Sequence, residues 1–499
     1  MLIALRTVSS LCTLLPVQDQ WTNLTSGAGT PPPGHEDACA AYDSRRRRLL
    51  MFGGQVACGG GSGQDAEGTT NSVWALDLDQ SGALYLNWKE LVPNIDDNTK
   101  EGVTVPQSRE DSAAVYDIEH DAFVLFGGDL EGRGPTCGVD RSNDTWSLNL
   151  TRLALDPGNP EKAWKKLQVT GAIPPKSKNH TAIFDPYSGE MHVYGEQMGP
   201  DVYSLDLDAL VWVHHDYSGG SGVFYPESRE QHVSAYDPWQ RRMLVFAGTE
   251  CNSPPKVWAL KLEELHDADG SIEDDWVKIT PSSGPHPPCR KQAVSGFDTL
   301  NNHFLIFGGQ DFNANLMNDT WALVLDPDDP PVRWVELLPG DPDVPKRRFD
   351  HTGAYDDLRK RFFVFAGDGE AGGLADTWEL RHCTVGAPEV TLYPRWRRSS
   401  ASPVVLTVLI RDDALFDLLP ILDSSVGIWL NDPSADKQSQ GYNYWPEFLR
   451  SSALSFIAPD LISISAPISL TPGTRMWNLT LIDIDSNRVH DTTAWILGN

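Results

Sequence analysis

Long apolar runs, positive charge and closely paired cysteines are scarce in these 499 residues. Beyond the first residues there is no run of about 20 apolar residues, which excludes a membrane-spanning helix. The 40 Lys and Arg stand against 69 Asp and Glu, for a net charge of -29. This excess disfavours nucleic acid and anionic membranes as partners, because both would repel the chain. With 40% hydrophobic residues, the chain can still bury a large core.

Signatures of common active sites are also missing. There is no CxxC zinc pair, no GxSxG elbow, no phosphate-binding Walker loop and no HExxH segment, although each of these short patterns would carry a recognisable chemistry. We therefore predict no catalytic residue, no metal site and no cofactor from the sequence.

Several features bear on the cellular compartment. Residues 1–18 (MLIALRTVSSLCTLLPVQ) form an apolar stretch interrupted by Arg6, which is either a secretory signal or an N-terminal extension. Six cysteines lie beyond it, and an even number suits disulfides. Asn-x-Ser/Thr glycosylation sequons predict glycans at Asn23, Asn149, Asn179 and Asn478. We predict a secreted or extracellular protein, with a cytoplasmic location as the alternative.

One block of sequence recurs six times. Each copy has an aromatic residue, an Asp, a polar turn and an apolar run that ends in a small pair, as a buried β-hairpin requires. The copies are residues 40–54 (AAYDSRRRRLLMFGG), 113–128 (AAVYDIEHDAFVLFGG), 181–196 (TAIFDPYSGEMHVYGE), 233–248 (VSAYDPWQRRMLVFAG), 294–309 (VSGFDTLNNHFLIFGG) and 352–367 (TGAYDDLRKRFFVFAG).

Two further strands complete each repeat. A third element follows every small pair and contains an aromatic residue, at Trp74, Trp146, Tyr203, Trp258, Trp321 and Trp378. A fourth element begins with tryptophan, at Trp88, Trp164, Trp212, Trp276 and Trp334. The sixth repeat lacks this fourth element, and WTNLT at Trp21 supplies it from the other chain end. A radial ring of sheets closed in this way leaves no exposed strand edge.

The glycine pair, the NDxW segment and the later tryptophan resemble the kelch repeat, and the resemblance covers residues 21–383. It implies an all-β fold with a six-bladed kelch β-propeller at residues 19–383. The small pairs at Gly195, Ala247 and Ala366 depart from the family's glycine pair. We expect the glycines to permit close backbone approach and the indoles to fill the space between blades.

Residues 384–499 do not continue the repeat. Their alternating and apolar runs, among them VVLTVLIRD and LISISAPISL, predict a small β-sandwich. This segment is similar to the immunoglobulin-like domain that follows the propeller in galactose-oxidase-like proteins. Asp483 and Asp485 lie in a D-x-D-x-N pattern, but Arg488 stands where a calcium loop needs glycine, so a solvated hairpin is expected there.

Register on the repeated Asp brings together the residues eight positions earlier: His35, Arg109, Ser177, Arg229, Arg290 and Arg348. All but Ser177 are basic or can become protonated. One interpretation is a ligand-binding ring at the channel mouth, since Arg matches carboxylate and phosphate groups. The other is neutralisation within the fold by the acids beside them in sequence, such as Glu110 and Asp350. His180, His232 and His351 also recur, and we expect a structural role rather than a metal cage.

The loops after the small pairs and the loops before the innermost strands share one face of a propeller, and this face is the expected binding surface. The face argument suggests one disulfide between Cys58 and Cys137, a second between Cys251 and Cys289, and a third between Cys39 and Cys383 at the ring closure.

These observations lead to one functional prediction and one alternative. The prediction is a secreted, non-catalytic kelch-repeat module that binds a protein or a glycan, including an acidic one, through this face. The alternative is a carbohydrate-active enzyme on the same scaffold, either a galactose-oxidase-like oxidase or a sialate-epimerase-like protein. The Tyr-His dipeptide of the oxidases is missing, as is the Glu-x3-Asp-x3-His triplet of the iron-dependent kelch specifier proteins, so the alternative depends on architecture alone.

Overall fold

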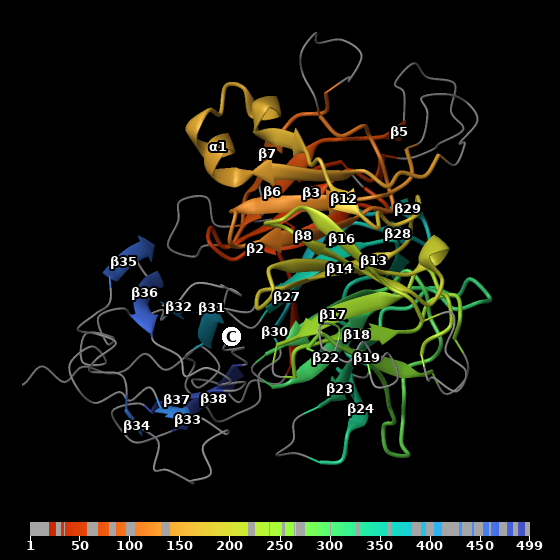
Figure 1. Cartoon of the computed structure of the whole chain (residues 1–499). Helices are drawn as coiled ribbons and strands as arrows, with labels where there is room; N and C mark the ends of the chain where they lie inside the picture. Colours follow the sequence, from red (N-terminus) through yellow and green to blue (C-terminus); the bar gives the residue numbers. More distant parts are fainter. Residues whose placement is uncertain are drawn as a thin grey trace, which may run out of the picture. The chain divides into compact units, whose positions relative to one another are not determined.

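The computed structural model (Figure 1) describes residues 19–381 apart from several segments, the longest being 57–67, 96–104, 131–139 and 266–274, and from residue 391 onward it describes strands only. The predicted leader, residues 1–18, lies outside the described residues. The larger compact unit contains Asp19–Asp185 and Gly189–His382. In the described part of the chain, no helix has the length and apolar character needed to span a membrane.

Within the described residues, six blade sheets form this larger unit, five of them four-stranded and that of blade 3 five-stranded. The first strands of neighbouring blades contact one another in a closed cycle, so they are innermost. Blade 1 contains β2 (Cys39–Asp43), β3 (Arg48–Phe52), β6 (Val73–Asp77) and β7 (Trp88–Val92). Blade 2 contains β8 (Ala113–Asp117), β9 (Ala122–Phe126), β10 (Thr145–Asn149) and β11 (Trp164–Lys166). Blade 3 contains β13 (Thr181–Asp185), β14 (Glu190–Tyr194), β15 (Val202–Asp206) and β16 (Val211–His215), with β12 (Thr170–Gly171) parallel to β16.

The remaining three sheets repeat this order. Blade 4 contains β17 (Val233–Asp237), β18 (Arg242–Phe246), β19 (Val257–Lys261) and β20 (Trp276–Ile279). Blade 5 contains β21 (Val294–Asp298), β22 (His303–Phe307), β23 (Thr320–Val324) and β24 (Arg333–Leu337). Blade 6 contains β26 (Thr352–Asp356), β27 (Arg361–Phe365), β30 (Thr377–Arg381) and, as its outer strand, β1 (Gln20–Asn23). The all-β class and the propeller architecture predicted from the sequence are confirmed.

The N-terminal strand β1 completes blade 6. It runs antiparallel to β30, with Trp21 opposite Leu380 and Asn23 opposite Trp378. The Trp21 indole packs on Phe307 of blade 5, with 5.0 Å between ring centroids, and its Nε1 donates to Thr320 Oγ1 at 3.2 Å. The segment missing from the sixth repeat is therefore supplied by the other end of the chain.

The other fourth-strand tryptophans pack in the same way between neighbouring blades. Each meets the aromatic residue that ends the second strand of the preceding blade: Trp88 and Phe365 (4.6 Å), Trp164 and Phe52 (5.5 Å), Trp212 and Phe126 (5.1 Å), Trp276 and Tyr194 (5.3 Å), and Trp334 and Phe246 (5.0 Å). These tilted or edge-on contacts are favourable beyond their buried area. They explain why the tryptophan recurs at one register of the repeat.

The small pair permits close approach of the next blade. Gly53 and Gly54 have positive φ, and a Cβ added to Gly53 would lie 2.5 Å from the carbonyl oxygen of Arg109. The second residue of each pair donates its N–H to the following blade, and the six bonds form a closed cycle: Gly54 to Arg109, Gly128 to Ser177, Glu196 to Arg229, Gly248 to Arg290, Gly309 to Arg348 and Gly367 to His35. Where a non-glycine residue replaces a member of the pair, as at Glu196, Ala247 and Ala366, it keeps a positive φ.

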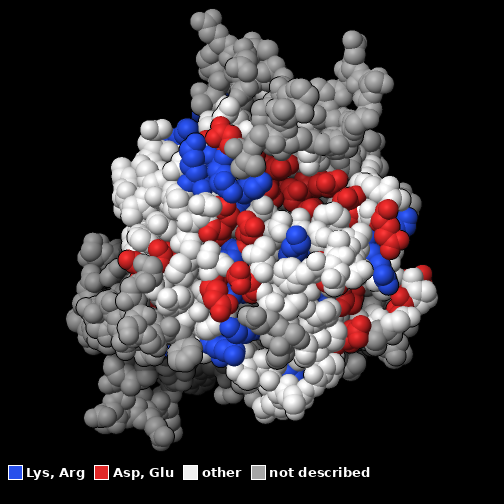
Figure 2. Space-filling model, turned by 90° about the vertical axis from the view of Figure 1, so that its right-hand side faces the viewer, with Lys and Arg blue, Asp and Glu red and all other residues white. Residues whose placement is uncertain are grey.

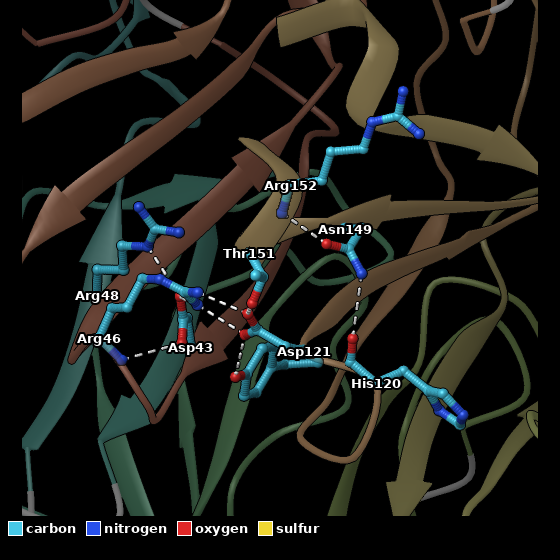
Figure 3. Close-up of polar contacts among 9 residues, drawn as sticks. Asp43, Arg46, Arg48, His120, Asp121, Asn149, Thr151 and Arg152 are labelled. Carbon is cyan, nitrogen blue, oxygen red and sulfur yellow. Dashed lines mark hydrogen bonds and ion pairs between the residues drawn. The ribbon is translucent and has the colours of Figure 1, made fainter. Parts of the chain in front are cut away.

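Charged turns connect blades 1 and 2 at the opposite end of the sheets (Figure 3). Arg46 donates to Asp43 of its own blade at 3.2 Å and to both carboxylate oxygens of Asp121 of blade 2 at 2.6 Å. Thr151 also donates to Asp121, from helix α1 (Leu150–Leu155), which follows β10. The repeated Asp43 therefore holds the turn from which Arg46 reaches blade 2.

Shorter elements complete the description. Among the described residues, β4 (Gln55–Val56) pairs with β5 (Gly68–Thr69). Strand β28 (Asp368–Gly369) pairs with both β29 (Gly372–Gly373) and β25 (Arg348–Phe349). Two 3-10 helices are η2 (Pro160–Ala163) and η3 (Glu196–Met198).

The C-terminal segment forms two antiparallel four-stranded sheets, the strand complement of a sandwich. The first has the order β31 (Thr391–Arg395), β32 (Val404–Arg411), β36 (Leu461–Ile468) and β35 (Ala453–Ala458). The second has the order β34 (Tyr442–Asn443), β33 (Trp429–Asn431), β37 (Trp477–Ile482) and β38 (Arg488–Ala494). The immunoglobulin-like character of this segment stays a prediction.

Candidate binding face

The segments before the inner strands and those after the small pairs lie together on one face of the propeller. Glu36 bridges to Gln55, Glu110 to Asp129 and Lys291 to Gln310, while in blade 6 strand β25 pairs with β28. The labels β5, β28 and β29 mark this side in Figure 1, and Figure 2 looks onto it. Acidic side chains form several groups there, with basic side chains beside them. The glycine-rich stretches 57–67 and 131–139 lie outside the described residues.

The registered basic residues are buried inside their blades. His35, Arg109, Arg229, Arg290 and Arg348 are at most 2% exposed. In three blades the guanidinium meets the Asp that precedes the third strand: Arg109 with Asp144 (2.6 Å), Arg290 with Asp319 (2.7 Å) and Arg348 with Asp376 (2.6 Å). The same arginines donate Nη1 to the carbonyls of Gly127, Gly308 and Ala366 at 2.8–3.0 Å.

These contacts correct the expectation of an open basic ring at Arg109, Arg290 and Arg348. Each guanidinium donates its hydrogen bonds within its own blade, because a buried guanidinium needs both a counter-charge and carbonyl acceptors. The interpretation of neutralisation within the fold describes these blades better. However, the partner is the Asp of the NDTW or ADTW segment, rather than the acids adjacent to the arginine in sequence. Their pairing is structural.

Blades 1, 3 and 4 depart from this arrangement. Blade 1 replaces both partners, with His35 and Ser72 in place of Arg and Asp. Blade 3 has Ser177, and its Asp201 accepts instead from His214 Nε2 (2.8 Å) and the backbone N–H of Tyr217 (2.9 Å). Blade 4 keeps Arg229, but Lys256 occupies the Asp position.

A second set of residues, two positions after the registered ones, encircles the channel mouth. We call Asp37, Asp111, Asn179, Gln231, Gln292 and Asp350 the mouth ring. Each has a φ between 51° and 56°, a left-handed conformation that Asp and Asn adopt more readily than most residues. Each donates its N–H to the carbonyl of its neighbour in the preceding blade at 3.0–3.3 Å, and these six bonds form a closed cycle.

Side chains of the mouth ring also contact one another. Asn179 Nδ2 donates to Asp111 Oδ2 at 3.0 Å. The carboxyl group of Asp37 lies close enough to those of Asp350 and Asp111 for their charges to act on it. The ring therefore brings three acids together.

The pKa values of these acids follow from burial and mutual repulsion. Burial, and then the negative charges of Asp350 and Asp111, raise the pKa of Asp37 well above its usual range. Burial raises the pKa of Asp350 to about 7, with the charge of Asp111 adding to the effect and the Asp37 hydrogen bond opposing it. Burial also raises the pKa of Asp111, and Lys178 at 3.4 Å opposes that rise. The mouth thus contains three acids with raised pKa values, and that of Asp350 lies near neutral pH.

The recurring histidines belong to the core. His180, His232 and His351 meet Phe126, Tyr194 and Phe307 edge-on at 5.2–5.4 Å. Burial lowers the pKa of His180 to about 4 and that of His351 to about 3, so both are neutral at pH 7. Within the described residues, no three His, Cys, Asp or Glu side chains are grouped so that they could hold a metal ion.

The cysteines divide into three cases. Cys251 and Cys289 form a disulfide with 5.6 Å between their Cα atoms, the pair suggested by the sequence. Cys39 is a free buried thiol, which corrects the expected link to Cys383. It lies between blades 1 and 2, where its Sγ donates to the Phe52 carbonyl and accepts from Ser112 Oγ (3.4 Å), and burial raises its pKa to about 11. Cys58, Cys137 and Cys383 lie outside the described residues.

Two of the predicted glycosylation sites use their side-chain amides within the fold. Asn149 caps helix α1 by accepting from the N–H of Arg152 (2.7 Å), and its Nδ2 donates to the His120 carbonyl at 3.4 Å (Figure 3). Asn179 bonds Asp111 in the mouth ring. Asn23 is exposed on β1, and Asn478 lies on β37. A glycan is attached at Nδ2, so on Asn149 or Asn179 it would disturb the Nδ2 contacts with His120 and Asp111, whereas Asn23 is exposed.

The sequence and the structure were compared with known proteins. No family model matches. Dynein regulatory complex subunit 7 of Chlamydomonas reinhardtii is 28% identical over 131 residues, which covers 25% of this chain and 10% of that protein. Acyl-CoA-binding domain-containing protein 5 of Arabidopsis thaliana is 25% identical over 218 residues, covering 42% of this chain and 31% of that protein. The aligned regions thus span about a tenth and a third of these relatives.

Among solved structures, that of YjhT matches with a TM-score of 0.45 and 13% sequence identity, covering 70% of this chain and 95% of the other. Each of these proteins is one that the chain resembles in part.

Proposed function

We propose that this chain is a secreted, non-catalytic kelch-type propeller that binds a protein or glycan through the face carrying the mouth ring. The observation that supports the proposal is the mouth ring itself. Each of the six blades contributes one Asp, Asn or Gln to it, next to the axis and beside the segments that follow the small pairs. Such convergence of polar side chains from separate elements is typical of recognition surfaces.

The chemistry of the ring favours a ligand rich in hydroxyl or amide N–H groups at the axis. Carboxylate and amide oxygens accept hydrogen bonds, and the residues Asn179, Gln231 and Gln292 add amide donors. The arginines of blades 2, 5 and 6, which would have favoured an acidic ligand at the axis, are paired with Asp inside their own blades. Sugar hydroxyls or the backbone of an extended peptide therefore suit the mouth better than an anion does.

One observation favours the alternative of a carbohydrate-active enzyme. The pKa of Asp350 is raised to about 7 by burial and by the charge of Asp111, and a carboxyl group poised near neutral pH can act as a general acid or base. Here Asp350 would accept a proton from a sugar hydroxyl, or return one to it.

Glycan-array and pull-down binding by the full-length chain tests the proposal. Asp111→Asn removes a charged acceptor and the Lys178 partner at the mouth, whereas Asp208→Asn changes an exposed acid in the β15–β16 turn at the other end of the blades. We expect D111N to weaken binding about tenfold or more and D208N to leave it unchanged. Equal binding by both variants would remove the mouth from the proposal. Chemical alteration of the captured glycan, read by mass spectrometry, would favour the enzyme.

A further inference from the structure

Three blades build the same small carboxylate-binding site from the Arg before the inner strand and the Trp of the third strand. The Asp carboxylate between them accepts from both side chains. In blade 5, Arg290 Nη1 and Nη2 reach Asp319 at 2.8 and 2.7 Å, and Trp321 Nε1 reaches it at 2.6 Å. Blades 2 and 6 repeat the arrangement, with indole distances of 2.7 Å from Trp146 to Asp144 and from Trp378 to Asp376.

Blade 4 keeps both donors and lacks the acceptor. Arg229 still donates Nε to the Glu227 carbonyl (3.1 Å) and Nη1 to the Ala247 carbonyl (3.0 Å). Its Nη2 and the Nε1 of Trp258 are buried and have no hydrogen-bond partner among the described residues. Arg229 is 2% exposed and Trp258 4% exposed. These are the donors that converge on Asp in the other blades.

The residue at the position of the missing Asp is Lys256, and it does not neutralise Arg229. Its ammonium group points to the exposed carboxylate of Glu227 at 3.5 Å, and about a third of its side chain is exposed (31%). The Tyr194 hydroxyl donates to the Glu227 carbonyl at 3.0 Å and lies beside Arg229, whose charge opposes the rise that burial causes in the pKa of Tyr194. Blade 4 therefore combines a buried guanidinium, an unsatisfied indole N–H and a second cation.

A buried cation without a counter-charge is costly, as is a buried donor without an acceptor. Blade 1 avoids this cost, because His35 replaces the Arg where Ser72 replaces the Asp, and Trp74 Nε1 donates to Ser72 Oγ at 3.2 Å. Among the blades that carry the Arg, blade 4 alone in the described residues has a Lys in place of the Asp. The donor set remains complete there and is complementary to one carboxylate.

We propose that Arg229, Lys256 and Trp258 form a site for a carboxylate supplied from outside the chain, by an Asp or Glu side chain of a bound peptide. The ligand carboxylate takes the place that Asp319 occupies in blade 5, and it reaches Arg229 by passing the flexible Lys256 side chain. This inference rests on the proposed function and deepens it, because it names the group on the partner that blade 4 would recognise.

The test uses the full chain labelled with ¹⁵N, with the Trp258 indole N–H assigned from its loss in Trp258→Phe. The probes are three N-acetylated tripeptides. Acetyl-Gly-Asp-Gly-amide and acetyl-Gly-Asn-Gly-amide are blocked at both ends, and acetyl-Gly-Gly-Gly has a free carboxyl terminus. We expect the Asp peptide to shift the Trp258 signal and the Asn peptide to leave it unchanged. A shift with the free terminus alone would overturn the assignment to a side-chain carboxylate.

Lys256→Asp is the decisive variant, because it restores the carboxylate found in blades 2, 5 and 6. We expect it to move the Trp258 signal without any peptide, to abolish the response to the Asp peptide and to raise Tm by about 2 °C. The matched control Lys89→Asp makes the same charge change at an exposed position of β7 and should do none of these. An unchanged Trp258 signal in K256D would overturn the proposal.

A second variant, Arg229→Gln, keeps the inference testable if K256D does not fold. It should weaken binding of the Asp peptide about tenfold or more. A partner captured on the array by both wild type and R229Q, with the Trp258 signal silent, would end this inference and leave the proposed function standing. If the Asp peptide shifts the Trp258 signal but the chain captures no partner, the site in blade 4 stands and the proposed function fails.

Discussion

Blades 5 and 4 place an arginine at the same register, and they differ in what neutralises it. Arg290 holds Asp319 and is a structural element of its blade, whereas Arg229 has the cation Lys256 at that position. The comparison teaches that an isolated arginine on a propeller face says little about ligand binding. In a repeat protein each blade can be compared with the others. Blade 4 keeps the Arg and Trp donors of blades 2, 5 and 6 but lacks their Asp acceptor, and packing alone does not require this difference.

The largest effect is expected from removing the acceptor in blade 5. Asp319→Ala leaves Arg290 buried and uncompensated, and breaking a buried pair in this way costs about 3–5 kcal/mol. Urea unfolding of the full chain measures the change, with the exposed Glu336→Ala on β24 of the same blade as the control. If D319A unfolded at the same urea concentration as E336A, the Arg290–Asp319 pair would not stabilise blade 5, and the comparison with blade 4 would fail.

Replacing each arginine by methionine makes the comparison direct. Arg290→Met strands the Asp319 carboxylate and should destabilise the chain by about 2 kcal/mol or more. Arg229→Met strands no acid and removes an uncompensated cation, so the change should lie within about 1 kcal/mol of zero. Paired thermal scans of the two variants measure the difference. Equal losses would show that Arg229 is as well neutralised as Arg290.

The pH dependence of stability also tests the ion pair between Arg290 and Asp319. Burial alone would raise the pKa of Asp319, but the hydrogen bond and charge of Arg290 outweigh it and lower the pKa below the ordinary 3.8. A carboxylate with a lowered pKa contributes stability above its unfolded pKa, and this contribution is lost as the pH falls through the folded value. The cost of Asp319→Asn, about 1–2 kcal/mol at pH 7, should therefore shrink below pH 3.8. A cost that is constant from pH 7 to 2.5 would contradict the ion pair.

The mouth ring offers a further comparison, because blade 4 has the neutral Gln231 there and blade 6 has Asp350. Because the pKa of Asp350 is raised from 3.8 to about 7, its ionisation costs stability as the pH rises through this window. Asp350→Asn should match wild type at pH 4 and be more stable than wild type by about 2–4 kcal/mol at pH 8. Unfolding at the two pH values measures it. A D350N variant less stable than wild type at pH 8 would mean that the charged acid is favoured in the ring.

Much of the propeller could be predicted from the sequence because its signals are repeated. The aromatic-Asp pair, the small pair and the two later aromatic positions recur with fixed order, and each has a contact that requires it: a turn, a close approach or a ring between blades. The N-terminal strand was predictable because Trp21 filled a gap in an otherwise regular pattern.

The site was less predictable because single residues were interpreted apart from their partners. The arginines looked like a ring from their spacing alone, and the Asp that neutralises each is 28–35 residues away. A signal was present: Arg and Asp occur together in three repeats, and Ser72 accompanies His35. The mouth ring had a weaker signal, since only Asp, Asn and Gln occupy a position whose left-handed backbone the sequence does not show. The pairing of Cys39 failed because a strand position was treated as if it were a loop.

The pairing of β1 with β30 has a consequence for biosynthesis. Trp21 is synthesised before its partner Leu380, which follows after more than 350 further residues. Until residue 381 has emerged from the ribosome, the outer strand β1 has no complete β30 to pair with, and the Trp21 indole is not held against Phe307 of blade 5. The nascent chain must therefore keep an early segment available to a late one, and any factor that holds residues 20–23 during synthesis controls when the ring can close.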